Sequence, residues 1–276
     1  MAETLSMRQR YAGQSVIEKL VRHQADMPRR SPLARLLGRS PLNADATAWH
    51  LDAQAEITMG RILDMLPAEW TVLHALPAGM GALDIDHLVI GPSGVFTVNT
   101  KHHHDKLVWV AKSALVIDGE AFGYIPAAEF EAQRVSAIVE ERMLLPTPVQ
   151  PVVAFIDPKK VTIRERPDQV KVVDAWQLRR WLTNLAPVLS PTEQREIVSV
   201  LDDPVTWHAT GSESSPSDAS SSPQSTSSMG LQAAFDLIDA EVRSAHARRG
   251  FWKLVGYGAL LIGPLVALPV VLSLLG

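Results

Sequence analysis

Two apolar segments of the chain carry polar residues at positions that a β-hairpin would bring together. The residues between them, Gly91-Pro92-Ser93-Gly94, are typical of a hairpin loop, because proline presets φ and glycine tolerates positive φ. Pairing Ile90 with Val95 across this loop fixes the register, and side chains then alternate between the two faces of the sheet. One face receives four polar residues, Asp84, Asp86, Asn99 and Lys101. The other face receives Ile85, His87, Val89, Phe96, Val98 and Thr100.

The polar face of this hairpin has the parts that metal-assisted phosphodiester hydrolysis requires. Carboxylate and amide oxygens are the ligands that Mg²⁺ and Mn²⁺ prefer. A lysine beside them can orient the attacking water and stabilise the charge that builds on a phosphate. Glu56, on a helix predicted over residues 51–66, either points toward the same cleft or lies on the helix surface. The same residues are also compatible with an ordinary ion pair between Asp84 and Lys101 at an exposed end of a sheet.

Strands that alternate with helices are predicted around this hairpin. The predicted helices cover residues 51–66, 127–144, 175–184 and 192–202, and the predicted strands cover 70–76, 83–90, 95–101, 152–156 and 170–173, with weaker strands within 107–117. Pro146 and Pro148 end the second helix, and Ser190 is a plausible cap of the last. This order predicts an α/β fold in which a mixed sheet carries helices on its faces.

The hairpin and its surroundings resemble the nuclease-related domain family, NERD. The matching residues are Gly81, Ile85-Asp86-His87-Leu88-Val89-Ile90, Gly91-Pro92-Ser93-Gly94-Val95-Phe96 and Asn99-Thr100-Lys101. The resemblance covers about residues 50–160 and includes Glu56 before the hairpin and Glu131-Ala132-Gln133 after it. The NERD family is similar to nucleases of the restriction-endonuclease-like, PD-(D/E)xK type, so the resemblance implies that fold.

The resemblance also implies roles for individual residues. It makes Glu56 the helix carboxylate, Asp86 the central metal ligand and Lys101 the catalytic lysine. Gln133 either orients the attacking water or Lys101, as in the family, or is a solvated helix residue.

Asn99 departs from the nuclease pattern, which has Asp or Glu at this position. An amide oxygen can bind a hard cation but brings no charge, so metal affinity is expected to fall. Asp84, which the register places beside this group, could compensate. The implied metal ligands are Asp86, Asn99, Asp84 and Glu56, and the implied cofactor is Mg²⁺ or Mn²⁺.

Two functions are compatible with these residues. The favoured one is Mg²⁺- or Mn²⁺-dependent phosphodiester hydrolysis of nucleic acid, either DNA or RNA. The alternative is a catalytically degenerate domain that binds nucleic acid or protein at a membrane. Asn99 and the net charge of −4 favour the alternative, because a dedicated nucleic-acid binder is usually basic.

Other metal chemistry is disfavoured by the composition and by the spacing of the histidines. The chain has no cysteine, which excludes a disulfide framework, a thiolate metal site and a thiol nucleophile. His102-His103-His104 follow one another on an extended segment, where neighbouring side chains point in opposite directions. We therefore expect a strand end at the surface there.

Residues 251–276 are predicted to cross a membrane. No charged residue occurs from Leu254 to Leu275, and a helix of this length would cover roughly 33 Å, which is enough for a bilayer core. Phe251, Trp252 and Tyr257 are placed as aromatic anchors at the interface. Four cationic residues, Arg243, Arg248, Arg249 and Lys253, precede the segment, which predicts a single-pass C-terminal anchor with the preceding domain facing the cytoplasm.

The remaining segments are predicted from their composition. Residues 1–40 carry a charge of +5, so the first segment is either a solvated arm or helix or a contact for phosphates or anionic lipid. The Ser-rich stretch before residue 230 cannot bury enough apolar surface to fold. The helix after it has an apolar stripe that either lies on lipid or self-associates. The predicted segments are a basic arm over 1–44, the NERD-like α/β domain over 45–207, a flexible linker over 208–229, an amphipathic juxtamembrane helix over 230–250 and the transmembrane helix over 251–276.

Overall fold

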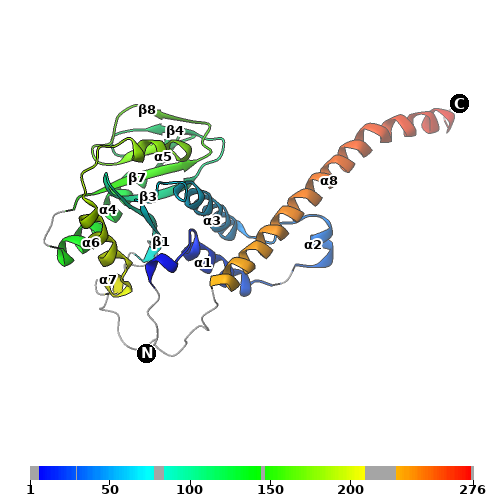
Figure 1. Ribbon diagram of the computed structural model, residues 1–276. Helices are drawn as coiled ribbons and strands as arrows, with labels where there is room; N and C mark the ends of the chain where they lie inside the picture. Colours follow the sequence, from blue (N-terminus) through cyan, green and yellow to red (C-terminus); the bar gives the residue numbers. More distant parts are fainter. Residues whose placement is uncertain (1–5, 29, 78–83, 144–146, 209–227, 275–276) are drawn as a thin grey trace. The chain divides into compact units, whose positions relative to one another are not determined.

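In the computed structural model, the chain forms two units, each made from two stretches of sequence (Figure 1). The structure describes residues 6–28, 30–77, 84–143, 147–208 and 228–274, without the side chains of residues 256 and 258–274. The first unit combines Met1–Glu18 with Trp49–Ser225, and the second combines Lys19–Ala48 with Thr226–Gly276. The predicted linker over 208–229 lies almost entirely outside the described residues.

A five-stranded mixed sheet is the centre of the first unit. Its order is β1-β2-β3-β7-β9, with antiparallel pairing from β1 to β3 and parallel pairing from β3 to β9. The strands are β1 (Thr71–Pro77), β2 (Asp84–Gly91), β3 (Gly94–His102), β7 (Val149–Ile156) and β9 (Lys171–Asp174). The mixed α/β sheet predicted from the sequence is confirmed.

The predicted hairpin register is confirmed for the part of the hairpin in which β2 and β3 pair. Ile90 pairs with Val95 and Leu88 with Thr97. Ile85 departs from the predicted alternation, because it packs in the core cluster that contains Leu88 instead of the one that contains Val89. Ala75 of the neighbouring strand β1 has a φ of 51°, which interrupts the extended backbone beside this position, so regular alternation does not continue through it.

A second, four-stranded sheet is formed by strands that come after β3 and before β9 in the sequence. Its order is β6-β5-β4-β8, and β4 and β8 run parallel. The strands are β4 (Leu107–Val110), β5 (Leu115–Ile117), β6 (Glu120–Phe122) and β8 (Lys160–Ile163). Buried residues of β4 and β5 form a core cluster with Val153 and Phe155 of β7.

Helices cover both faces of the five-stranded sheet. Apolar residues of α3 (Ala44–Leu63) and α5 (Ala175–Thr183) pack with Val89, Phe96 and Val98, whereas α4 (Tyr124–Arg142), α6 (Pro191–Asp202) and α7 (Pro204–His208) pack on the cluster with Leu88 and Val95. A capping box between Ser190 and Glu193 begins α6, as the sequence predicts. The helix predicted from residue 51 begins at Ala44 instead, where the Asn43 side chain accepts a hydrogen bond from the Ala46 N–H at 2.8 Å.

Gly91, at the end of β2, leaves space for the ring of Trp70. A methyl group at position 91 would lie 2.2 Å from the Trp70 ring. We expect Gly91→Ala to lower the free energy of unfolding by about 1–3 kcal/mol, because the ring must move within a packed core. The measurement is urea unfolding followed by tryptophan fluorescence. Gly123→Ala is the control, since nothing lies within 4 Å of the added methyl, and should change stability by no more than about 0.5 kcal/mol. Equal stability of the two variants would contradict the prediction.

The predicted basic arm over 1–44 is divided between the two units. In the first unit, the 3₁₀ helix η1 (Met7–Gln9) inserts Met7 into the core cluster beside the sheet. The Arg10 Nε–H donates to the carbonyl of Ala75 at 2.6 Å. The beginning of the chain therefore forms part of this unit, and α1 (Gln14–Ala25) follows it.

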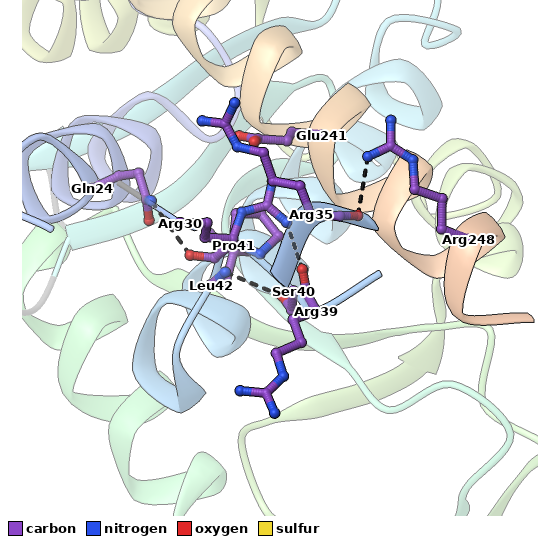
Figure 2. A network of polar contacts seen from close by, with 9 residues as sticks. All are labelled: Gln24, Arg30, Arg35, Arg39, Ser40, Pro41, Leu42, Glu241 and Arg248. Atoms are coloured by element: carbon purple, nitrogen blue, oxygen red, sulfur yellow. Dashed lines mark hydrogen bonds and ion pairs between the residues drawn. The ribbon is translucent and has the colours of Figure 1, made fainter. Parts of the chain in front are cut away.

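The second unit pairs the segment around α2 (Pro32–Leu36) with the long helix α8 (Ser228–Leu274) (Figure 2). Phe235, Val242 and Ala245 of α8 are buried. The helix continues through residue 250, where the sequence predicted a boundary between two segments. Among the described residues, none of the helices has a stretch that is long and apolar enough for a membrane crossing. Most of the predicted span, residues 258–276, lies outside the residues whose side chains are described.

Candidate active site

Asp86 lies on β2 at the end of the hairpin away from the turn. The Thr100 N–H of β3 donates to its Oδ2 at 2.7 Å, which holds the carboxylate against the neighbouring strand. Burial raises the pKa of Asp86 to about 6, and the Lys101 ammonium and the Thr100 N–H oppose this rise. The charges of Asp52 and Asp84 raise the pKa of Asp86 further.

Lys101 lies near the end of β3, as the sequence predicts. Its Nζ is 5.0 Å from the centre of the Tyr124 ring, a distance at which a cation and an aromatic face attract each other. The Lys101 charge lowers the pKa of Glu56, of Asp86 and of Glu131, so it acts on carboxyl groups from three different elements. One cation thus opposes the mutual repulsion of the surrounding carboxylates.

Glu56 is buried on α3, with 5% of its surface exposed. Burial, and next the charge of Asp86, raise the pKa of Glu56 well above its usual range, against the attraction of Lys101. The Gly13 N–H donates to its carboxylate. Of the two alternatives left open by the sequence, the structure selects the one in which Glu56 points inward toward Asp86.

Asn99 and Glu131 form a buried polar pair next to these residues. The Asn99 Nδ2–H donates to Oε1 of Glu131 at 2.7 Å. The other oxygen of each side chain, Oδ1 of Asn99 and Oε2 of Glu131, is buried and has no hydrogen-bond partner. Burial and then the charge of Asp86 raise the pKa of Glu131 to about 8, although Lys101 and Asn99 oppose this. Two unpartnered buried oxygens are costly unless they bind something.

Glu131 is the site residue that the sequence did not assign, although helical spacing could have found it. It lies on α4 three residues after Ala128 and four before Val135, both of which are buried, so it shares their face of the helix. Gln133 is exposed, because two residues along a helix correspond to nearly opposite faces. The residue of α4 that faces the strands is thus Glu131, and Gln133 does not lie with the site.

The site residues provide the chemistry that a hard divalent cation requires. Carboxylates from α3, β2 and α4 and an amide from β3 act on one another electrostatically, and oxygen is the ligand type that Mg²⁺ and Mn²⁺ prefer. The unpartnered oxygens of Asn99 and Glu131 are suited to the same role. Within the described ranges, the side chains do not form a ready-made metal-binding group of three or more His, Asp or Glu residues.

The three consecutive histidines do not converge, as the sequence predicts. The rings of His102 and His104 stack with their centres 6.4 Å apart. His103 lies elsewhere, with its Nε2 3.0 Å from the Tyr124 hydroxyl and its ring against Phe122. His103 thus has different neighbours from His102 and His104.

His87 of the hairpin packs in the core. It is fully buried on β2, and its Nδ1 is 2.8 Å from Nδ1 of His74 on β1. Burial and then the charge of His74 lower the pKa of His87 well below its usual range. Two neutral rings can share this hydrogen bond, with one as donor and the other as acceptor.

A cavity in the first unit lies at the other end of β3. Its volume is about 770 Å³, and Gly94 and Val149, the first residues of β3 and β7, are among its lining residues. Asp86 and Lys101 do not line it.

Comparison with known proteins agrees with the sequence resemblance over part of the chain. A search of curated proteins and a search of solved structures each gave no match. Residues 51–156 match the family model described as NERD, nuclease-related domain. This segment extends from α3 to the end of β7 and contains Glu56, Asp86, Lys101 and Glu131. The match supports a nuclease-related function for residues 51–156.

Proposed function

We propose that the nuclease-related domain is a divalent-metal-dependent nuclease that hydrolyses phosphodiester bonds of nucleic acid. The observation that carries this proposal is that Glu56 and Glu131 are buried among groups that include Asp86 and Lys101, and that Glu131 has a buried oxygen without a hydrogen-bond partner. Burying several carboxylates beside one another is unfavourable, and groups with strongly shifted pKa values cluster at functional sites. A divalent cation would neutralise this excess of negative charge.

The residues that would hold Mg²⁺ or Mn²⁺ are Asp86, Glu56, Asn99 and Glu131. Bound there, the cation would supply Lewis-acid activation of the phosphate and lower the pKa of a coordinated water. Lys101 would orient the attacking water and stabilise the negative charge that develops on the phosphate. The Thr100 N–H keeps Asp86 oriented for its role.

Glu131 can supply the charge that Asn99 lacks. Nucleases of this pattern carry Asp or Glu where this chain has Asn99, and the amide of Asn99 holds the Glu131 carboxylate at 2.7 Å. The carboxylate that completes the site would therefore come from α4, in place of the compensation by Asp84 that the hairpin register suggested. Asp84 contributes through its charge, which raises the pKa of Asp86.

Glu131→Gln is expected to weaken Mn²⁺ binding by about 10- to 100-fold or more, because the amide that replaces the carboxylate brings no charge to the metal. Glutamine still accepts the Asn99 hydrogen bond, so the fold should be retained. The measurement is calorimetric titration of the purified full chain in detergent. The control is Glu140→Gln on the exposed face of the same helix, which should bind as the wild type does. Equal Mn²⁺ affinities of the two variants would show that Glu131 does not contribute to the metal site.

Cleavage itself is tested with single-stranded DNA, double-stranded DNA and RNA. We expect the full chain to cut at least one of these with Mg²⁺ or Mn²⁺ and not with a chelator. Cleavage that persists in Asp86→Asn would show a contaminant or a different site. If the full chain neither binds metal nor cuts any of these substrates, the domain is left as a binding module.

That binding module is the second candidate function, and one observation favours it. Asn99 replaces a charged ligand and engages Glu131, and the described residues include no preformed metal group. This candidate predicts that Mn²⁺ does not raise the melting temperature, because only a ligand that binds the folded state stabilises it.

We also propose that residues 251–276 anchor the chain in a membrane with the domain on the cytoplasmic side. The support is the sequence, in which no charge occurs between Leu254 and Leu275 while Arg248, Arg249 and Lys253 precede them. Carbonate extraction of membranes from expressing cells should leave the full chain in the pellet. Release of the chain into the supernatant would contradict the anchor.

A further inference from the structure

We propose that α2 and the turn after it form a second contact with an anionic membrane surface, beside the proposed C-terminal anchor. This inference extends the anchoring proposal by giving a lipid-binding role to residues 31–39, near the other end of the chain. It rests on a surface that we name the lipid platform. The lipid platform consists of Leu33, Arg35, Leu36, Leu37 and Arg39 with Arg248, Arg249, Phe251, Trp252, Lys253, Leu254, Val255 and Tyr257.

The exposure of α2 is unusual for such an apolar helix. Its residues Leu33 and Leu36 are 63% and 57% exposed, Leu37 after it is 43% exposed, and no residue of the helix is buried. Single exposed leucines are ordinary, but a contiguous group of them marks an interaction surface. Aromatic and aliphatic side chains of α8, from Phe251 to Tyr257, add further exposed apolar surface.

Specific contacts hold α2 against α8, so the two groups of apolar residues form one surface. The Trp252 Nε1–H donates to the carbonyl of Leu36 at 2.8 Å. The Arg248 Nη1–H donates to the carbonyl of Arg35 at 3.1 Å (Figure 2). These acceptors are the last two carbonyls of α2, and the Arg35 carbonyl also accepts from the Gly38 N–H at 3.2 Å. The two side chains of α8 thus bind the C-terminal end of α2.

The turn after α2 lies against the backbone of α8. Gly38 has a φ of 68°, and a methyl group there would lie 2.4 Å from the Arg249 nitrogen and 2.6 Å from the Ala245 carbonyl oxygen. Only glycine permits this approach. Arg30 forms an ion pair with Glu241 and also donates to the carbonyl of Arg39 (Figure 2). The segment is thus fixed in place with its leucines exposed.

The charge of the lipid platform indicates which partner covers it. Residues 30–42 and 242–257 contain no Asp or Glu. Arg35, Arg39, Arg248, Arg249 and Lys253 are all exposed. Basic residues around exposed leucine and aromatic side chains are typical of surfaces that lie at the boundary between anionic headgroups and acyl chains. The sequence that follows Lys253 in the same helix is uncharged, as expected of a segment that enters lipid. We therefore favour lipid over a protein partner.

The absence of cysteine makes a site-specific test possible in the full chain. Leu36→Cys is labelled with an environment-sensitive fluorophore, and the matched control is Val205→Cys of α7, since the two positions are exposed to a similar degree, 57% and 54%. The full chain is reconstituted in vesicles of phosphatidylcholine with phosphatidylglycerol, or of phosphatidylcholine alone. We expect a blue shift and quenching by nitroxide-labelled lipid at position 36, a smaller effect without the anionic lipid, and no effect at position 205.

The outcomes separate this inference from the anchor on which it rests. Chain that floats with the vesicles while the label at position 36 remains in water overturns the lipid platform and leaves the anchor standing. Chain that does not float overturns both. An equal shift at position 205 means non-specific adsorption and also contradicts the inference. Arg35→Gln combined with Arg39→Gln should weaken the dependence on phosphatidylglycerol, because these arginines supply part of the attraction to anionic headgroups.

Discussion

Asp86→Asn is expected to abolish cleavage of nucleic acid while making the metal-free protein more stable at pH 8, by about 1–3 kcal/mol. The two effects have one cause, the placement of a carboxylate where ionisation is unfavourable. Asparagine keeps an oxygen for the Thr100 N–H but has no charge to desolvate or to bind a cation. Active sites commonly contain residues that lower the stability of the fold but are needed for activity.

The shifted pKa of Asp86 explains why the substitution stabilises the folded protein at pH 8 and predicts how this stabilisation depends on pH. The pKa of Asp86 is raised from its ordinary value of 3.8 to about 6, so between these values the folded state binds more protons than the unfolded state. The stability from this group is complete below pH 3.8 and is lost as pH rises through 6. The advantage of Asp86→Asn should therefore grow between about pH 4 and pH 7 and then level off.

The measurement is urea unfolding with a chelator at a series of pH values, for wild type and Asp86→Asn. Added Mn²⁺ should stabilise the wild type and have no effect on the variant, because only the wild type retains the central ligand. A stability difference that is independent of pH would show that the Asp86 carboxylate is not held in the desolvated environment described here.

Lys101→Met is expected to lower the cleavage rate by about 10²–10⁴-fold, a range that spans the loss of a positioned proton-transfer or charge-stabilising group. Methionine retains much of the aliphatic length beside Tyr124 but carries no charge. Mn²⁺ binding should persist at pH 8, because the oxygen ligands remain and the repelling ammonium is gone. The measurements are single-turnover cleavage and calorimetric titration of the same preparation.

Lys106→Met is the matched control for Lys101→Met. Lys106 pairs with Asp118 at 2.7 Å on the surface and does not act on the carboxyl groups of the site. Its cleavage rate should equal that of the wild type. Equal loss in both variants would mean that general positive charge, such as that needed to attract nucleic acid, accounts for the effect of Lys101.

The core of the site could be predicted from the sequence because it depends on local geometry. The loop Gly91-Pro92-Ser93-Gly94 specifies a hairpin in which Ile90 pairs with Val95, and Asp86 then lies within hydrogen-bond distance of the Thr100 N–H. A hairpin connects residues that are close in the chain, so turn chemistry and alternation suffice to specify it.

Glu131 was missed because its contact is not local. It lies 32 residues from Asn99, on a helix whose rotation about its axis is set by packing. Glu131 and Gln133 are both polar residues of the same helix, and family resemblance favoured Gln133. The buried stripe through Ala128 and Val135 would have favoured Glu131.

The second sheet and the second unit could not be predicted for a similar reason. The strands β4 and β8 pair across about fifty residues, and each is only four residues long. The alternation of so short a strand does not specify a partner. In the second unit, the residues that meet are more than 200 positions apart, as with Arg35 and Arg248. Nothing in their local sequence indicates such a pairing.

The division of the second unit between residues 19–48 and 226–276 has a consequence for the order in which the protein is made. The ribosome synthesises the segment around α2 before the first unit's residues 49–225, but its partner α8 follows them. The part of the first unit from Trp49 onward is translated before α8, the helix that fixes Leu33, Leu36 and Leu37, has been made. During this interval the segment lacks the two hydrogen bonds from Arg248 and Trp252 that hold it in the second unit. The second unit is therefore completed only after the first unit has been translated, so a chain truncated before residue 226 would keep the first unit but leave this segment without the helix that fixes it.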